Sequence, residues 1–132
     1  MAINILFTCA GRRNYLINYF KVAVKGQGQI IAADMCLSAP AMVDADKDVL
    51  VPSIYDTNYI PTLKTIIKAN AITAIISLND LELPILAKHK KELESTGAKV
   101  LISSERVIDI AFDKVETFNF ISSIGLNTPQ TY

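Results

Sequence analysis

The hydrophobic residues of the chain gather in five short uninterrupted runs, and between these runs they recur at helical spacing. The runs predict strands at residues 3–7, 29–33, 48–51, 73–77 and 99–102. Uninterrupted apolar runs, rather than alternating ones, are typical of strands that are covered on both faces. The pattern therefore favours a parallel sheet between two layers of helices.

The stretches between the runs have the apolar periodicity of amphipathic helices. In the first helix we expect Leu16, Phe20 and Ala23 on the buried face. Asn58 and Asp80 stand at N-cap positions of the second and third helices, and the lysines and glutamates of the third helix are expected to face water. The expected helices are 14–24, 59–69 and 81–95, with one helical turn within 35–47.

The end of the chain changes character. It predicts two further helices, at 104–111 and 114–124, with Gly125 ending the second. Asp113 is expected to cap that helix, and Glu116 follows at the spacing of a capping box.

Strands that alternate with helices predict an α/β fold, a Rossmann-like doubly wound parallel sheet with strand order 3-2-1-4-5 and a C-terminal helical connection. We expect residues 1–112 to form this domain and residues 113–132 to form a helix and linker. Residues 128–132 look like the start of an extended segment, because Pro129 disfavours helix in the residue before it. We therefore expect a further domain to follow.

Composition limits the classes of protein that remain. With 132 residues, 51% of them hydrophobic, the chain has enough apolar surface for one folded domain. Lys+Arg and Asp+Glu are both 13, so no net charge favours nucleic acid or an anionic membrane. No apolar run approaches the roughly 18 residues of a membrane span, and no signal-peptide pattern opens the chain. Cys9 and Cys36 form no CxxC motif, so we expect reduced thiols in a cytoplasmic protein.

Nothing in the sequence predicts a metal site. The single histidine, His89, lies in the lysine-rich AKHKKE without a ligating partner nearby, which favours a solvated helix residue. The segment DADKD at 44–48 resembles the start of a calcium-binding loop, but Val49 replaces its glycine and Tyr55 its final glutamate. A solvated connection between elements is the simpler interpretation.

The segment FTCAGRRNYL, which follows the first strand, is the first candidate binding site. Ligands of open α/β sheets bind at the carboxyl ends of strands where the strand order reverses, here between the first and fourth strands. Loop N–H groups and a helix start favour an anion, and Arg12 and Arg13 add forked cationic donors. With Gly11 they form a candidate site for a carboxylate or phosphate. The alternative is that the arginines are solvated or paired with an acid such as Asp34.

A stand-alone dinucleotide-binding module is the second hypothesis. Its fingerprint asks for three glycines, and this loop has only Gly11. Asp34 supports the hypothesis, because it ends the second strand 23 positions after Gly11, where an acid would hold a ribose hydroxyl. A response-regulator-like interaction domain is a third hypothesis, but the first strand ends in Thr8 and Cys9 without the acid that such a domain requires.

Two further segments carry candidate residues. Asn79 and Asp80 follow the fourth strand in SLNDLE, so they are expected to face the same crevice as the first loop. Asp80 suits a helix cap, a substrate amine, or both. In FDKVET, Lys114 stands at a helix start, where the helix dipole disfavours a cation, which is a mild indication that it reaches an anion.

Four segments together resemble the amino-terminal part of ATP-grasp ligases, and most closely the carbamoyl-phosphate synthase large-subunit-like group. The resemblance covers essentially the whole chain in order. It implies a pre-ATP-grasp domain, a Rossmann-like unit that binds substrate and forms one wall of the nucleotide site. The segments are ILFTCAGRRNYLINYFK, AADMCLSAPAMVDADKDVLVP, ISLNDLELPILA and AFDKVETFNFISSIGLNTPQTY.

The resemblance also implies roles for individual residues. Lys114 matches a basic residue that contacts ATP phosphates in the family. The substrate or anion side matches, more loosely, Gly11, Arg12, Arg13, Asn79 and Asp80. The resemblance assigns no catalytic residue and no metal ligand to this chain.

For the complete protein, the resemblance implies a ligase that joins a carboxylate to an amine through an acyl-phosphate, using ATP and Mg²⁺. The family's other nucleotide and magnesium residues lie beyond position 132, so the chain alone is expected to be inactive and to bind ATP weakly. Its expected partners are the ATP-grasp domain and a small carboxylate or amine substrate. A homodimer is one way to cover the tyrosines Tyr15 and Tyr19.

Overall fold

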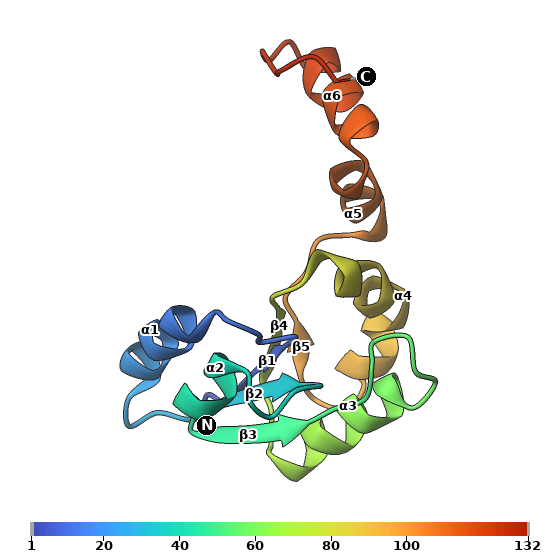
Figure 1. Ribbon diagram of the computed structural model, residues 1–132. Coiled ribbons are helices and arrows are strands. Elements are labelled where there is room, and N and C mark those ends of the chain that lie inside the picture. Colours follow the sequence, from blue (N-terminus) through green and yellow to red (C-terminus); the bar gives the residue numbers. More distant parts are fainter. Residues whose placement is uncertain (1, 132) are drawn as a thin grey trace. The chain divides into compact units, whose positions relative to one another are not determined.

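The computed structural model describes residues 2–131, which form a five-stranded, all-parallel sheet with helices between the strands (Figure 1). The strand order is β3-β2-β1-β4-β5, which confirms the predicted α/β fold. The strands are β1 (Ile5–Thr8), β2 (Ile30–Asp34), β3 (Lys47–Leu50), β4 (Ala74–Ser77) and β5 (Lys99–Val100). The helices are α1 (Asn14–Val24), α2 (Pro40–Asp44), α3 (Tyr59–Ala69), the 3-10 helix η1 (Asp80–Glu82), α4 (Leu83–Glu94), α5 (Glu105–Phe112) and α6 (Lys114–Ser123).

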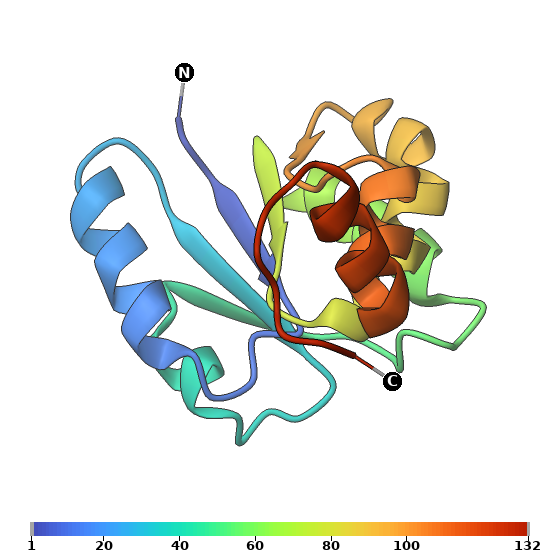
Figure 2. The same ribbon diagram turned by 90° about the horizontal axis from the view of Figure 1, so that it is seen from above.

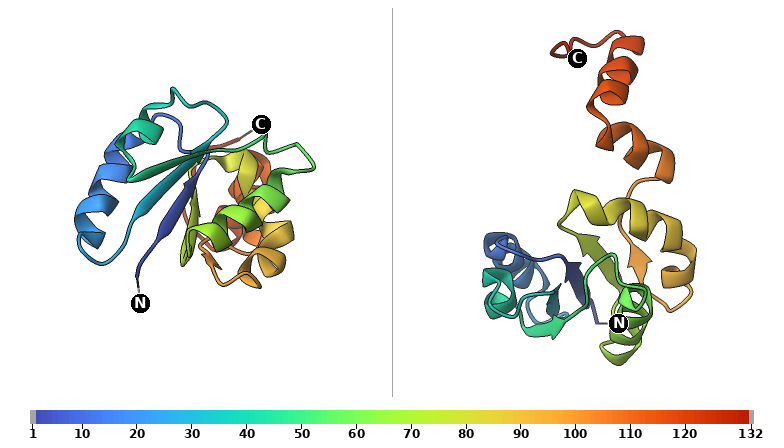
Figure 3. Two further views of the ribbon diagram at one scale, coloured as in Figure 1. Left: turned by 90° about the horizontal axis from the view of Figure 1, so that it is seen from below. Right: turned by 45° about the vertical axis from the view of Figure 1, so that its right-hand side comes forward.

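The sheet lies between two helical layers, with α1 and α2 on one face and α3 and α4 on the other (Figures 2 and 3). Successive residues of β1 therefore enter different cores. Leu6 packs with residues of α3 and α4, whereas Phe7 packs with α1 and α2 and meets Phe20 edge-to-face. Because both faces are covered, β1 and β2 are buried along nearly their whole length.

The edge strand β3 departs from this picture. Three of its four residues are exposed, although the uninterrupted apolar run predicted burial on both faces. The reason is its position at the end of the sheet, where a strand has a neighbour on one side only.

The buried face of α1 also differs in detail from the prediction. Ile17 and Val24 are buried, with Leu16 and Phe20 packed partly against the same core, whereas Ala23 is exposed. The helix therefore buries the stripe that runs through Ile17, Phe20 and Val24, at spacings of three and four residues. The expected single helical turn between β2 and β3 is confirmed as the short helix α2.

Two of the predicted helix caps are wrong and one is confirmed. Asn58 precedes α3, but its side chain accepts no capping hydrogen bond. After β4 the capping side chain belongs to Asn79, which accepts from the N–H of Leu81, because the helix starts at Asp80 itself. Asp113 caps α6 as predicted, accepting from the backbone of Val115 and Glu116.

The chain divides into two compact units, residues 1–102 and residues 103–132. The first contains the sheet with α1 to α4, and the second contains α5 and α6. Gly125 follows α6 with a positive φ of 79°, as expected of a residue that ends a helix. Residues 126–131 form no regular element, and Tyr132, the last residue of the predicted extended segment, lies outside the described residues.

Candidate functional site

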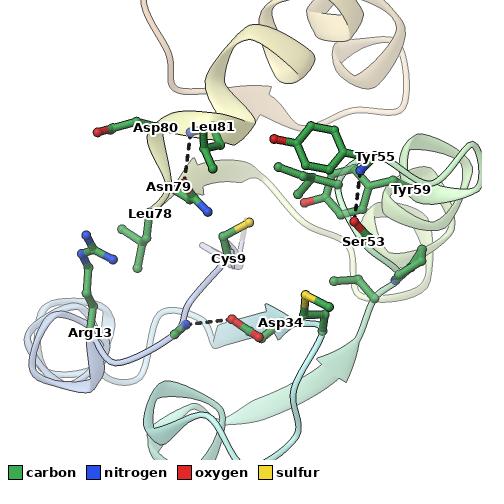
Figure 4. A pocket seen from close by; sticks show the side chains of 15 residues that line it. Cys9, Arg13, Asp34, Ser53, Tyr55, Tyr59, Leu78, Asn79, Asp80 and Leu81 are labelled. Carbon is green, nitrogen blue, oxygen red and sulfur yellow. Dashed lines mark hydrogen bonds between the residues drawn. The ribbon is translucent and has the colours of Figure 1, made fainter. Parts of the chain in front are cut away.

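A pocket of about 570 Å³ lies at the carboxyl ends of the first four strands, inside the unit of residues 1–102 (Figure 4). It occupies the position that the strand order predicts, between the loops that follow the adjacent strands β1 and β4, where the strand order reverses. Four of the predicted site residues line it: Gly11, Arg13, Asn79 and Asp80. Arg12 does not line it, and Lys114 belongs to the other unit, at the first position of α6.

The loop after β1 owes its shape to two residues with positive φ. Gly11 has a φ of 51°, which glycine adopts without steric cost. Cys9 has a φ of 49°, an uncommon conformation for a residue with a side chain. The carbonyl of Gly11 accepts from the N–H of Ala41 at 3.1 Å, which ties the loop to the start of α2.

Asp34, at the end of β2, braces this loop through its carboxylate. One oxygen accepts from the N–H of Gly11 at 2.9 Å and the other from the N–H of Cys36 at 3.0 Å. Its backbone carbonyl accepts from the N–H of Val51 beyond β3. Asp34 therefore fixes the segments that follow β1 and β2, and both carboxylate oxygens are already used in doing so. The predicted role as a ribose acceptor gains no support from this arrangement.

The two adjacent arginines have different surroundings. In residues 2–131, the ion pairs link Lys21 with Asp46 and Glu92 with Lys64 and His89, so neither arginine is paired and the proposed pairing with Asp34 is not found. Arg13 precedes α1 and its side chain extends along the pocket wall (Figure 4). Arg13 thus supplies the cation of the pocket.

The turn after β4 forms the facing wall. The N–H of Asn79 donates to the hydroxyl of Ser77 at 3.3 Å, and the side-chain oxygen of Asn79 accepts from Leu81 at 3.0 Å. Asp80 is exposed at the pocket rim. Since Asn79 performs the capping, the carboxylate of Asp80 is not needed as a cap.

A buried carboxylate behind the pocket was not predicted. Glu82 is fully buried, although its place in an amphipathic helical stretch predicted a solvated side chain. Three hydroxyl groups donate to it: those of Thr8, Tyr59 and Ser77. Burial and the nearby negative charge of Glu82 raise the pKa of the Cys9 thiol and of the Tyr59 hydroxyl. No local sequence signal distinguishes Glu82 from Glu92, which is exposed on α4.

Among the described residues, no group of three or more histidine, cysteine or acidic side chains is placed to hold a metal ion. His89 contacts Glu92 on α4, its Nδ1 lying 3.1 Å from a carboxylate oxygen. None of the helices in residues 2–131 has the length and apolar character needed to cross a membrane.

The bracing role of Asp34 leads to a stability prediction. Asp34→Ala leaves the N–H groups of Gly11 and Cys36 without their acceptor, and we expect a loss of about 2 kcal/mol in the free energy of unfolding. Urea unfolding of the chain measures it. Asp56→Ala is the control, because Asp56 is exposed and, among the described residues, its carboxylate accepts from the N–H of Asn58 alone. If the two variants lose the same free energy of unfolding, the bracing role of Asp34 is contradicted.

Comparison with known proteins agrees with this architecture. A family model described as the PylC-like N-terminal domain matches residues 5–101. A search of curated protein sequences found no match.

Several solved structures share the fold. N5-carboxyaminoimidazole ribonucleotide synthetase from Thermotoga maritima is similar with a TM-score of 0.65 at 19% identity, covering 97% of this chain and 32% of that chain. Glycinamide-RNase-transformylase T from Mycobacterium tuberculosis gives 0.68 at 15% identity, with 96% and 37% covered. L-amino acid ligase from Bacillus licheniformis gives 0.65 at 18% identity, with 96% and 31% covered. The chain thus spans about a third of the length of these structures.

These findings agree on one point. The family match covers the whole sheet with its pocket, and the structures that share this fold include an L-amino acid ligase about three times as long as the chain. The predicted closer resemblance to the carbamoyl-phosphate synthase group is not confirmed by these comparisons. The chain belongs to the family of PylC-like N-terminal domains, the type of domain that stands at the amino-terminal end of ATP-grasp ligases.

Proposed function

We propose that the chain is the substrate-side domain of a ligase that joins a carboxylate to an amine through an acyl-phosphate. The observation that carries the proposal is the pocket at the carboxyl ends of the strands, with the unpaired Arg13 along one wall. A guanidinium that has no carboxylate partner in residues 2–131 is suited to bind the carboxylate of a small substrate with two parallel hydrogen bonds. The family match supports the same class of enzyme.

The opposite wall suits the amine side of the reaction or the remaining polar groups of the acid. Asn79 presents an amide, and the carboxylate of Asp80 lies at the rim without a capping role. The pocket therefore offers a cation on the loop after β1, and an amide NH2 donor and a carboxylate acceptor on the turn after β4. Such a division orients a substrate that carries groups of both signs.

The nucleotide site of the complete protein is a separate part of the proposal. Two solved structures of similar fold are described as ADP complexes, of N5-carboxyaminoimidazole ribonucleotide synthetase and N5-carboxyaminoimidazole synthetase. ATP with Mg²⁺ would supply the phosphoryl group that activates the carboxylate. Of the residues in this chain we assign only Lys114 to the nucleotide phosphates. The division of the chain into a domain at 1–112 and a connecting helix at 113–132 belongs to the same proposal.

The test is ATP turnover by the complete protein, with a panel of carboxylic acids and amines and release of ADP as the signal. For the acid that is used, we expect Arg13→Ala to raise KM roughly 10- to 100-fold, since a charge-assisted hydrogen bond to the carboxylate is lost. Arg12→Ala is the matched control, because Arg12 is adjacent but does not line the pocket, and its KM should change less than about twofold.

Two outcomes would count against the proposal. If no combination of acid and amine stimulates ADP release, the assignment of ligase activity is wrong. If Arg12→Ala raises KM for the acid as much as Arg13→Ala does, the ligase activity still holds, but the carboxylate does not bind at the pocket wall. Tight binding of NAD by the chain would instead support the dinucleotide hypothesis.

A further inference from the structure

The buried carboxylate of Glu82 joins three parts of the chain that are far apart in sequence. The hydroxyl of Thr8, in β1, donates to it at 2.8 Å, and the hydroxyl of Ser77, in β4, donates to the same oxygen at 2.6 Å. The hydroxyl of Tyr59, at the start of α3, donates to the other oxygen. We call these four residues the Glu82 network. Each of its side-chain oxygens has a hydrogen-bond partner.

No cation neutralises this carboxylate. In the described residues, the ion pairs of the chain all lie elsewhere, and the partners of Glu82 are neutral hydroxyl groups. A fully buried charge without a counterion is costly and needs several well-placed hydrogen bonds to persist. An amphipathic helix does not require such a group for its own stability, so its presence at this position calls for another reason.

Each donor in the network is attached directly to a part of the pocket. Tyr59 itself lines the pocket, and Thr8 precedes the lining residue Cys9. Ser77 holds the following turn, accepting from the N–H of Asn79 and lying 3.2 Å from its carbonyl oxygen. A direct backbone bond, from the N–H of Leu78 to the carbonyl of Thr8, ties β4 to β1 beside the network.

We propose that Glu82 is a positioning residue that, through its three hydroxyl donors, fixes the lining residues Cys9, Tyr59 and Asn79, here called the pocket floor, and thereby sets the affinity for the ligand of the pocket. The statement about affinity rests on the proposed function, whereas the statement about the floor does not. Burial raises the pKa of the Cys9 thiol, and the nearby carboxylates of Glu82 and Asp34 raise it further, so that all three disfavour a thiolate there. Cys9 is therefore a local reporter of the network.

The first experiment uses this reporter in the chain of 132 residues. Cys36→Ser leaves Cys9 as the only thiol, and its alkylation by iodoacetamide is followed at a pH of about 8. We expect Glu82→Gln to speed alkylation about tenfold, because the floor loosens and a repelling charge disappears. Thr8→Val keeps the carboxylate and the shape but removes one donor, and we expect a smaller increase of about threefold.

Glu94→Gln is the matched control for Glu82→Gln. Glu94 is the last residue of α4, the helix that Glu82 immediately precedes. It is partly buried and its carboxylate accepts from the N–H of Val100 at 3.2 Å, at the end of α4 that lies far from the pocket residues. Its alkylation rate should stay within about twofold of the parent chain. Urea unfolding gives the stability of each variant, and hence the fraction of chains that are globally unfolded. That fraction shows how much of the alkylation occurs in unfolded chains. A rate in Glu82→Gln that rises no more than in Glu94→Gln, or that follows the unfolded fraction alone, would overturn the proposal.

The second experiment uses the complete ligase. We expect Glu82→Gln to raise KM for the ligand of the pocket about tenfold while kcat changes less than about twofold, because the residue acts on the shape of the site. A fall in kcat with KM unchanged would overturn the statement about affinity. If the wild-type protein has no ligase activity, the proposed function fails, and the alkylation rates still decide whether Glu82 fixes the floor.

Discussion

Replacing Gly28 with alanine is expected to destabilise the fold by about 3 kcal/mol or more, the largest effect that we expect of a single methyl group in this chain. A Cβ at this position would lie 1.8 Å from the carbonyl oxygen of Ile3 and 2.4 Å from its carbonyl carbon. Both are backbone atoms, and they cannot turn away as a flexible side chain would. At Gly28 the segment that leads into β2 runs in close backbone contact with the segment that leads into β1.

The backbone around Gly28 has little freedom to adjust. The N–H of Ile3 donates to the carbonyl of Gln27, and the N–H of Ile5 donates to the carbonyl of Gln29, so the residues on both sides of Gly28 are bonded to the approach to β1. Relieving the clash would break these bonds and shift the pairing between β1 and β2. The expected result is a lower urea concentration at the unfolding midpoint. The slope of the unfolding free energy against urea concentration should stay unchanged.

Gly26→Ala is the matched control, two residues away in the same connection. A Cβ at Gly26 meets nothing within 4 Å, but its φ of 76° disfavours alanine by about 1 kcal/mol. The comparison separates a steric clash from backbone strain. A smaller loss for Gly28→Ala than for Gly26→Ala would show that the close approach to Ile3 is not rigid.

The second large effect concerns Lys114 in the complete ligase. We expect Lys114→Ala to raise KM for ATP roughly 10- to 100-fold, since a charged donor to phosphate is lost. The fold should not suffer, because Lys114 is exposed at the first position of α6, where the helix dipole disfavours a cation. A loss of ATP affinity in a protein of unchanged stability would therefore be a direct effect on binding. Initial rates of ADP release against ATP concentration give the measurement.

Two controls accompany this prediction. Lys91→Ala removes an exposed lysine from the last turn of α4 and should leave KM for ATP unchanged. Asp34→Ala is also expected to leave ATP affinity nearly unchanged, because its carboxylate braces the loops of the substrate pocket. The opposite pattern, with Asp34 important and Lys114 without effect, would favour the dinucleotide hypothesis.

The sheet could be predicted from the sequence because burial on two faces leaves a simple local signal. The uninterrupted runs at 3–7 and 29–33 mark the central parallel strands β1 and β2, and the alternation with helices limits the order in which strands pair. The edge strand β3 gave the same signal, yet three of its four residues are exposed. Apolar content alone does not tell a central strand from an edge strand, since that depends on which strands pair.

The pocket could be predicted only in part, because its details depend on tertiary partners. The position of the loop follows from the strand order, but the orientation of the two adjacent arginines is set by the backbone, and only Arg13 lines the pocket. The spacing of Asp34 from Gly11 suggested a ribose acceptor, whereas the carboxylate accepts from N–H groups of the protein itself. Glu82 has the local sequence of a solvated helix residue, and its burial becomes visible only when its three donors are brought together.

The exposed edges of the sheet have a consequence for self-association. A sheet edge presents unpaired N–H and C=O groups that are able to recruit a strand from another molecule. At one edge, β3 carries the charged and exposed Lys47 and Asp48, and at the other edge β5 has only two residues. Both features discourage strand addition and the aggregation that follows from it. A second copy of the chain would therefore have to assemble through helical surface, where Tyr15 and Tyr19 of α1 stand exposed in edge-to-face contact.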